Sequence, residues 1–153
     1  MKKVLLAVLA LIVGSGAVLL GGKNPASQPV FSHVEQMKEG VLRIGEYSFQ
    51  TEFAITPEEK ARGLMFRPEL PPGHSMIFLN DNSRPMAVWM KNTFVPLDVL
   101  FFNAKHEISE IFEDLQPLDE TPRRTANPVW GMVEVPAGTV QKYKIKVGDK
   151  ISF

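Results

Sequence analysis

The amino-acid sequence predicts a mostly β domain, built as a jelly-roll-like sandwich or a partly closed barrel with two short helices. Apolar and polar residues alternate between Tyr47 and Ile55, which is the period of a half-buried strand. Further short apolar runs follow, separated by turn residues that include many of the 12 prolines and 11 glycines. At 153 residues and 44% hydrophobic content, the chain is long enough for one ordinary domain with its own core.

The N-terminal residues 1–22 have the pattern of a signal peptide or a membrane anchor. Lys2 and Lys3 precede an uncharged run from Val4 to Gly22. Residues 23–40 contain prolines and no clear period, and they are predicted to be a linker to a single β domain over residues 41–153. We therefore expect an extracytoplasmic protein, periplasmic or secreted, released by cleavage or anchored through residues 4–22.

The start of the domain is predicted in most detail. Residues 41–44 should pair with the strand that begins at Tyr47, across a turn at Gly45 and Glu46. Thr56, Pro57 and Glu59 then form a capping box with proline at the first helical position, so a short helix should run to about Gly63.

The rest of the domain is predicted to consist mainly of strands and turns. Strands are expected at residues 75–79, 86–91, 97–102, 106–113 and 129–135 and at the C-terminus, with turns at 81–85 and 103–105 and a short helix within 137–144.

The composition excludes several classes of site. Without cysteine there is no disulfide, zinc thiolate, iron–sulfur cluster or cysteine nucleophile. Seventeen basic residues balance 17 acidic ones without clustering, so we expect no nucleic-acid partner. His33, His74 and His106 lack metal-ligand spacing, and we predict neither a metal nor a cofactor. Met86 and Met90 on one strand face would suit Cu(I), but methionine more often fills cores.

Four segments, taken in order, carry a family resemblance. They are Arg62–Arg67 (RGLMFR) followed by Arg84–Pro85, Trp89–Thr93 (WMKNT) leading into Pro96–Phe101, Val133–Thr139 (VEVPAGT), and Lys146–Asp149. Together they resemble the DUF-192 family of bacterial and archaeal domains of unknown function, over about residues 41–153. The resemblance implies a compact, mostly β fold and implies no particular reaction.

Two carboxylates lie on otherwise apolar predicted strands. Asp98 and Glu134 would each lose free energy on burial unless they found a partner. We expect Lys91 or Arg62 beside Asp98, and Arg62 or Arg67 beside Glu134. If the two carboxylates lay close together, they would form a general acid/base pair.

The candidate ligand-binding residues are the charged, polar and aromatic side chains around these strands and turns. They are Arg62, Arg67, Arg84, Trp89, Lys91, Asn92, Thr93, Asp98 and Glu134.

The sequence favours a non-enzymatic binding domain for a small molecule, glycan or envelope protein, touching the membrane only through an uncleaved leader. An envelope hydrolase that uses Asp98 and Glu134 is one alternative. A purely structural accessory protein, whose charged residues only brace the fold, is the other.

Overall fold

A computed structural model describes residues 37–153, which form a mostly β domain with two short helices. The predicted leader and nearly all of the predicted linker lie outside these residues. Within them, no helix has the length and hydrophobicity needed to cross a membrane. The strands are β1 Lys38–Ile44, β2 Tyr47–Ala54, β3 His74–Arg84, β4 Ala87–Val88, β5 Leu97–Phe102, β6 Ile108–Leu115, β7 Arg123–Arg124, β8 Val129–Pro136 and β9 Ile151–Ser152. The helices are α1 Pro57–Arg62 and α2 Thr139–Tyr143.

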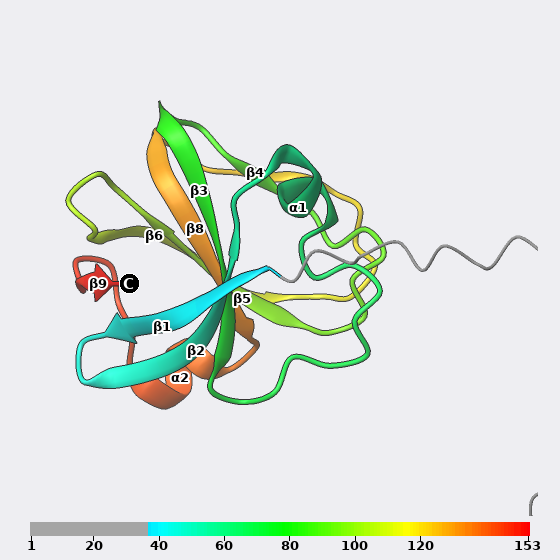
Figure 1. Cartoon of the computed structure of the whole chain (residues 1–153), viewed down its shortest axis with the longest axis horizontal. Coiled ribbons are helices and arrows are strands. Elements are labelled where there is room, and N and C mark those ends of the chain that lie inside the picture. The colour runs from blue at the N-terminus through cyan, green and yellow to red at the C-terminus, as the bar shows by residue number, and fades with distance from the viewer. Residues whose placement is uncertain (1–36) are drawn as a thin grey trace, which may run out of the picture. The chain divides into compact units, whose positions relative to one another are not determined.

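Seven strands form one sheet in the order β6-β5-β8-β3-β2-β1-β9 (Figure 1). The sheet curls until its two edges meet, because Ile108 N–H donates to Asp149 C=O at 2.8 Å and Ile151 N–H donates to His106 C=O at 2.9 Å. Of the two predicted architectures, the partly closed barrel is therefore correct, as a half-barrel formed by a single curled sheet.

The curled sheet buries one apolar cluster on each face. The inner cluster includes Phe49, Leu100, Phe102 and Val133, and α2 contributes Val140 to it. The outer cluster lies over β3, β8 and β5 and contains Met76, Phe78, Val99, Phe101 and Met132, together with Leu64, Leu70, Val88 and Met90 from the connecting segments. Because strand side chains alternate between faces, each strand of the sheet centre contributes to both clusters.

The hairpin and the capping box predicted at the start of the domain are confirmed. β1 and β2 form the hairpin, although β1 begins at Lys38 rather than at Val41. Thr56 Oγ1 accepts from Glu59 N–H at 3.1 Å, and the Glu59 carboxylate accepts in return from Thr56 N–H at 2.8 Å. These reciprocal bonds pair backbone groups that the first helical turn cannot satisfy.

Two predicted boundaries are wrong. β3 continues to Arg84 through the expected turn at 81–85, with an irregular register between Leu79 and Arg84. The strand expected at 86–91 shrinks to β4, which pairs with β7 in a separate two-stranded sheet. It ends because Met90 N–H donates to Asp119 C=O and Met90 C=O accepts from Thr93 N–H, which closes a turn.

The remaining strand and helix predictions hold with small shifts. β5 matches the predicted residues, β6 begins two residues later than expected, and β8 extends by one residue to Pro136. The second helix lies inside its predicted range as α2.

Candidate functional site

A groove of about 330 Å³ lies on the outer face of the half-barrel. One wall is the end of α1 and the loop after it, from Lys60 to Met65, and the other runs from β4 to Thr93. The floor consists of Phe78 from β3 and of Met132 and Glu134 from β8. The groove therefore lies between the sheet and the segments that cover its outer cluster, with α1 and β4 on the same side of the sheet (Figure 1).

Backbone geometry positions the first wall. Gly63 ends α1 at φ 47° and ψ −131°, a conformation that only glycine adopts readily. A Cβ atom at this position would lie 3.1 Å from the Phe78 ring. The glycine therefore both turns the chain and lets the loop approach the floor of the groove.

Two turns with left-handed residues join the walls. Phe66 has φ 64° and Asn92 has φ 52°, and Phe66 N–H donates to Asn92 C=O at 2.8 Å. The Thr93 hydroxyl donates to Lys91 C=O at 3.2 Å and tightens the second turn. This contact explains why the RGLMFR and WMKNT segments occur together: their turns support each other and place Trp89 and Thr93 at the groove.

Glu134 is the acid on the groove floor. It lies in a cross-strand row with Met76 on β3 and Val99 on β5, and only 6% of its surface is exposed. Within the described residues its carboxyl group forms no hydrogen bond, and burial raises its pKa to about 8, against the opposing charge of Arg67. At neutral pH the side chain is therefore mostly an uncharged carboxylic acid with an unused O–H donor.

Arg67 pairs with Glu52 rather than with Glu134, contrary to the prediction. Its two terminal nitrogens contact the two carboxylate oxygens of Glu52 at 2.5 and 2.6 Å, a bidentate pair. The Arg67 hydrogen bonds lower the pKa of Glu52, and Glu52 in turn raises the pKa of Arg67. Because Glu52, Met76 and Glu134 lie in one row, Arg67 still acts on Glu134 through its field.

Asp98 lies on the other face of the sheet. It is 1% exposed and accepts hydrogen bonds from the backbone N–H groups of Asp114 and Val140, both at 3.0 Å. The bond to Val140 caps α2, whose own N-cap residue, Gly138, has no side chain to do so. The prediction that Lys91 or Arg62 pairs with Asp98 is therefore wrong.

The proposed acid/base pair of Asp98 and Glu134 does not form. Asp98 lies opposite Val135 on β8, and Glu134 lies opposite Val99 on β5. Directly opposed residues share a face, and consecutive residues point to opposite faces. The sheet itself therefore separates the two carboxyl groups.

The other predicted residues divide between the groove and its surroundings. Arg62, Trp89 and Thr93 line the groove, and 48% of the Trp89 surface is exposed. Lys91 is exposed and Asn92 half-buried, and both belong to the turn beside the groove without lining it. Arg84 lies elsewhere on the sheet, where its Nε donates to Asn80 Oδ1 at 3.1 Å.

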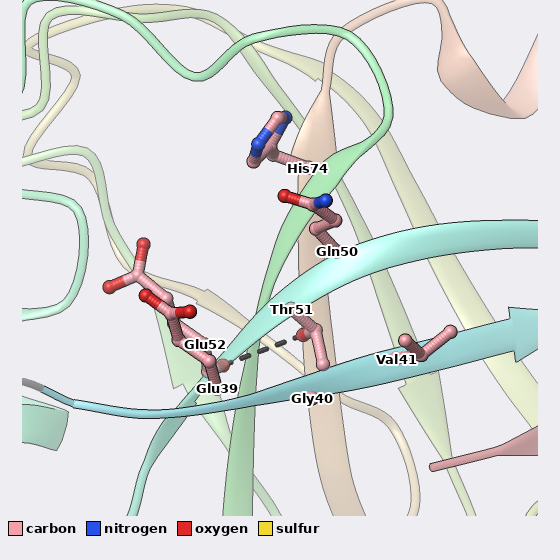
Figure 2. A pocket seen from close by; sticks show the side chains of 7 residues that line it. All are labelled: Glu39, Gly40, Val41, Gln50, Thr51, Glu52 and His74. Carbon is pink, nitrogen blue, oxygen red and sulfur yellow. Dashed lines mark hydrogen bonds between the residues drawn. The ribbon is translucent and has the colours of Figure 1, made fainter.

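The sequence prediction missed a second hollow of about 380 Å³, on the outer face of β1, β2 and β3. Figure 2 shows the carboxyl groups of Glu39 and Glu52 side by side, with the Gln50 amide toward His74. Nδ1 of His74 is buried without a hydrogen-bond partner in the described part of the chain. The polar side of the alternation in β2, which carries Gln50 and Glu52, was the signal available in the sequence.

Within residues 37–153, no group of three or more histidine, aspartate or glutamate side chains is arranged to hold a metal ion. Met76, Met90 and Met132 lie buried in the outer cluster, as the core interpretation of the methionines predicted.

Comparison with known proteins gives one family and two solved relatives. Residues 40–153 match the family model DUF192, described as an uncharacterised ACR. A protein of unknown function from Novosphingobium aromaticivorans DSM 12444 is 33% identical, with a TM-score of 0.75 over 87% of this chain and 100% of that one. A Sinorhizobium meliloti 1021 protein described as a "putative transcription regulator" is 31% identical, with a TM-score of 0.74 over 76% of this chain and 95% of that one. No curated protein matches the chain.

Proposed function

The chain belongs to the DUF192 family, and from the geometry of the groove we propose that it is a non-enzymatic binding domain for a small polar ligand. The observation that carries this proposal is Glu134, a buried carboxyl group on the floor of an open groove with no hydrogen-bond partner in the described domain. Burial removes most of the water around this group, so its ionised form costs free energy in the unliganded protein. A ligand that hydrogen-bonds to it recovers part of that cost.

The remaining lining fits a small molecule with both an apolar and a polar side. Trp89 offers a half-exposed aromatic surface, and Phe78 and Met132 provide an apolar floor. A buried polar group among apolar and aromatic residues is the usual composition of a ligand pocket. Catalysis by the Asp98–Glu134 pair has no support, because the two side chains lie on opposite faces of the sheet.

An extracytoplasmic location forms part of the proposal and rests on the sequence alone. The uncharged run after Lys2 and Lys3 supports export, and the ligand would then be a soluble molecule or an envelope component. The mass of the mature protein, purified from cells, tests whether the leader is removed.

Trp89 provides a direct assay for binding. In a Trp130→Phe background, Trp89 is the only tryptophan, so its fluorescence reports on the groove. We expect at least one compound from a panel of monosaccharides, amino acids and small organic acids to give saturable quenching that Glu134→Ala abolishes. Glu113→Ala, which removes an exposed carboxylate on β6, should leave the quenching unchanged.

The competing interpretation is a structural accessory protein. It predicts that no member of the panel saturates, or that any quenching is equal in Glu134→Ala and the parent protein. Either result would contradict the proposed binding function.

A further inference from the structure

We propose that the groove selects a small organic carboxylate, bound by a hydrogen bond from the acid form of Glu134 and by the positive charge of the groove mouth. This inference rests on the proposed binding function and narrows it to one class of ligand. It follows from the charges around the groove, from the protonation state of Glu134 on its floor and from the apolar and aromatic side chains of its walls.

The charge of the lining is positive. Lys60 and Arg62 line the groove, and within residues 37–153 neither has an acidic side chain at ion-pair distance. Glu134 is the only acidic residue in the lining. Arg67 adds little net charge, because Glu52 neutralises it. A lining with two cations and one uncharged acid attracts anions and repels cations.

The floor can donate a proton to such an anion. Arg67, from the loop beyond α1, is the charged group that acts on Glu134, and Glu52 on β2 pairs with it. Lys60 and Arg62 line the α1 wall of the groove, His74 lies at the start of β3, and the Trp89 wall presents no charged group. Because burial keeps Glu134 in its acid form at neutral pH, it offers an O–H donor. A hydrogen bond from a carboxylic acid to a carboxylate is short and charge-assisted, and about twice as strong as a neutral one.

The walls favour a monoanion with a flat or apolar body. Trp89 can stack against such a body, and Phe78, Val88 and Met132 can pack against it. A phosphate dianion would need several buried donors to replace its water, and the floor provides one. A carboxylate needs fewer donors and leaves its apolar part on the apolar lining.

Benzoate and benzamide form the matched pair of probes. They share ring and size, and they differ in that only benzoate carries the anionic acceptor. With Trp89 fluorescence in the Trp130→Phe background, we expect benzoate to bind at least tenfold more tightly than benzamide at pH 7. Inorganic phosphate should compete weakly or not at all.

Two variants assign the selectivity to its proposed sources. Arg62→Gln should weaken benzoate binding several-fold without affecting benzamide, whereas Arg43→Gln removes an equal charge from β1, outside the groove, and should change neither. Glu134→Gln is uncharged and keeps an N–H donor, so it should retain most of the affinity at pH 7.

The pH dependence separates the acid form of Glu134 from a purely structural role. In the parent protein, benzoate affinity should be level from about pH 5.5 to 7 and fall tenfold per pH unit above about 8, as Glu134 ionises and repels the anion. In Glu134→Gln this alkaline fall should disappear.

The outcomes distinguish the two proposals. Equal binding of benzoate and benzamide, or an alkaline fall that persists in Glu134→Gln, overturns the carboxylate inference and leaves the binding function intact. Saturable binding of neutral sugars in place of benzoate does the same. If no probe binds at the groove, both proposals fail.

Discussion

Replacing Glu134 with glutamine should make the stability of the domain less dependent on pH. Glutamine has nearly the same shape, keeps polar atoms at the groove floor and cannot ionise. Burial raises the pKa of Glu134 in the folded state from 4.5 to about 8. In the unfolded chain the same carboxyl group is exposed to water and has its ordinary pKa.

The sign follows from the direction of this pKa change. A group whose pKa is higher in the folded state binds protons more tightly there, so it favours folding at low pH, and that contribution is lost as the pH rises. The loss begins near 4.5 and is complete just above 8. At about 1.4 kcal/mol per pKa unit, the carboxylate costs about 3 kcal/mol of unfolding free energy at pH 7 and about 5 kcal/mol at pH 9.

Urea unfolding of the unliganded protein at pH 5, 7 and 9, followed by tryptophan fluorescence, measures this difference. The unfolding free energy of Glu134→Gln, measured relative to that of the parent protein, should rise by about 3 kcal/mol between pH 5 and pH 9. This figure allows for partial ionisation and for relaxation of the buried site. Glu113→Gln changes an exposed site, so its unfolding free energy should vary with pH as that of the parent protein does. If the difference between Glu134→Gln and the parent stays within about 0.5 kcal/mol across this range, Glu134 titrates normally. The donor role proposed for it would then be wrong.

Three further substitutions test other parts of the structure by the same urea assay. Asp98→Ala leaves two buried backbone N–H groups without acceptors, so it should cost about 2–4 kcal/mol, and a loss below 1 kcal/mol would show that water replaces the carboxylate. Gly131→Ala places a Cβ atom 2.6 Å from the Phe102 ring and closer still to a backbone oxygen, so it should lower the unfolding free energy by about 2 kcal/mol or more. An unchanged unfolding free energy would mean that β8 can shift to make room for the methyl group. Gly63→Ala strains the end of α1 and presses on the Phe78 ring, so it should lower the unfolding free energy by about 1–3 kcal/mol and weaken ligand binding. Unchanged binding would show that this turn does not shape the groove.

Local features of the structure were predictable because short-range physics determines them. The alternation in β2 and the capping box at Thr56 are each complete within about ten residues, and both are formed as expected. β4 fell short of its prediction because Met90 N–H bonds to Asp119, 29 positions along the chain. A strand requires partners on neighbouring strands, and its own residues do not reveal where those partners lie.

The partners of charged residues were the least predictable part of the site. A cation was predicted beside each of the two carboxylates, but Asp98 is satisfied by backbone N–H groups, and Glu134 has no hydrogen-bond partner in the described domain. Arg67 pairs with Glu52, 15 residues earlier, because the parallel pairing of β2 with β3 brings Glu52 into the row of Glu134. Only that register reveals the pairing.

The contrast between Asp98 and Glu134 also explains why the groove lies outside the half-barrel. The inner face is filled by an apolar cluster, and α2, capped by Asp98, contributes to that filling, so both oxygens of Asp98 are used by the fold. On the outer face the covering layer includes a short helix, β4 and two turns, and it leaves Glu134 on the floor of a groove. A carboxylate that the fold satisfies is accounted for by stability alone. Glu134 has no hydrogen-bond partner within residues 37–153, where Lys60 and Arg62 also lack an ion pair, and it lies beside a half-exposed tryptophan. Its burial costs stability when it ionises, and ligand binding offers a physical reason to retain it.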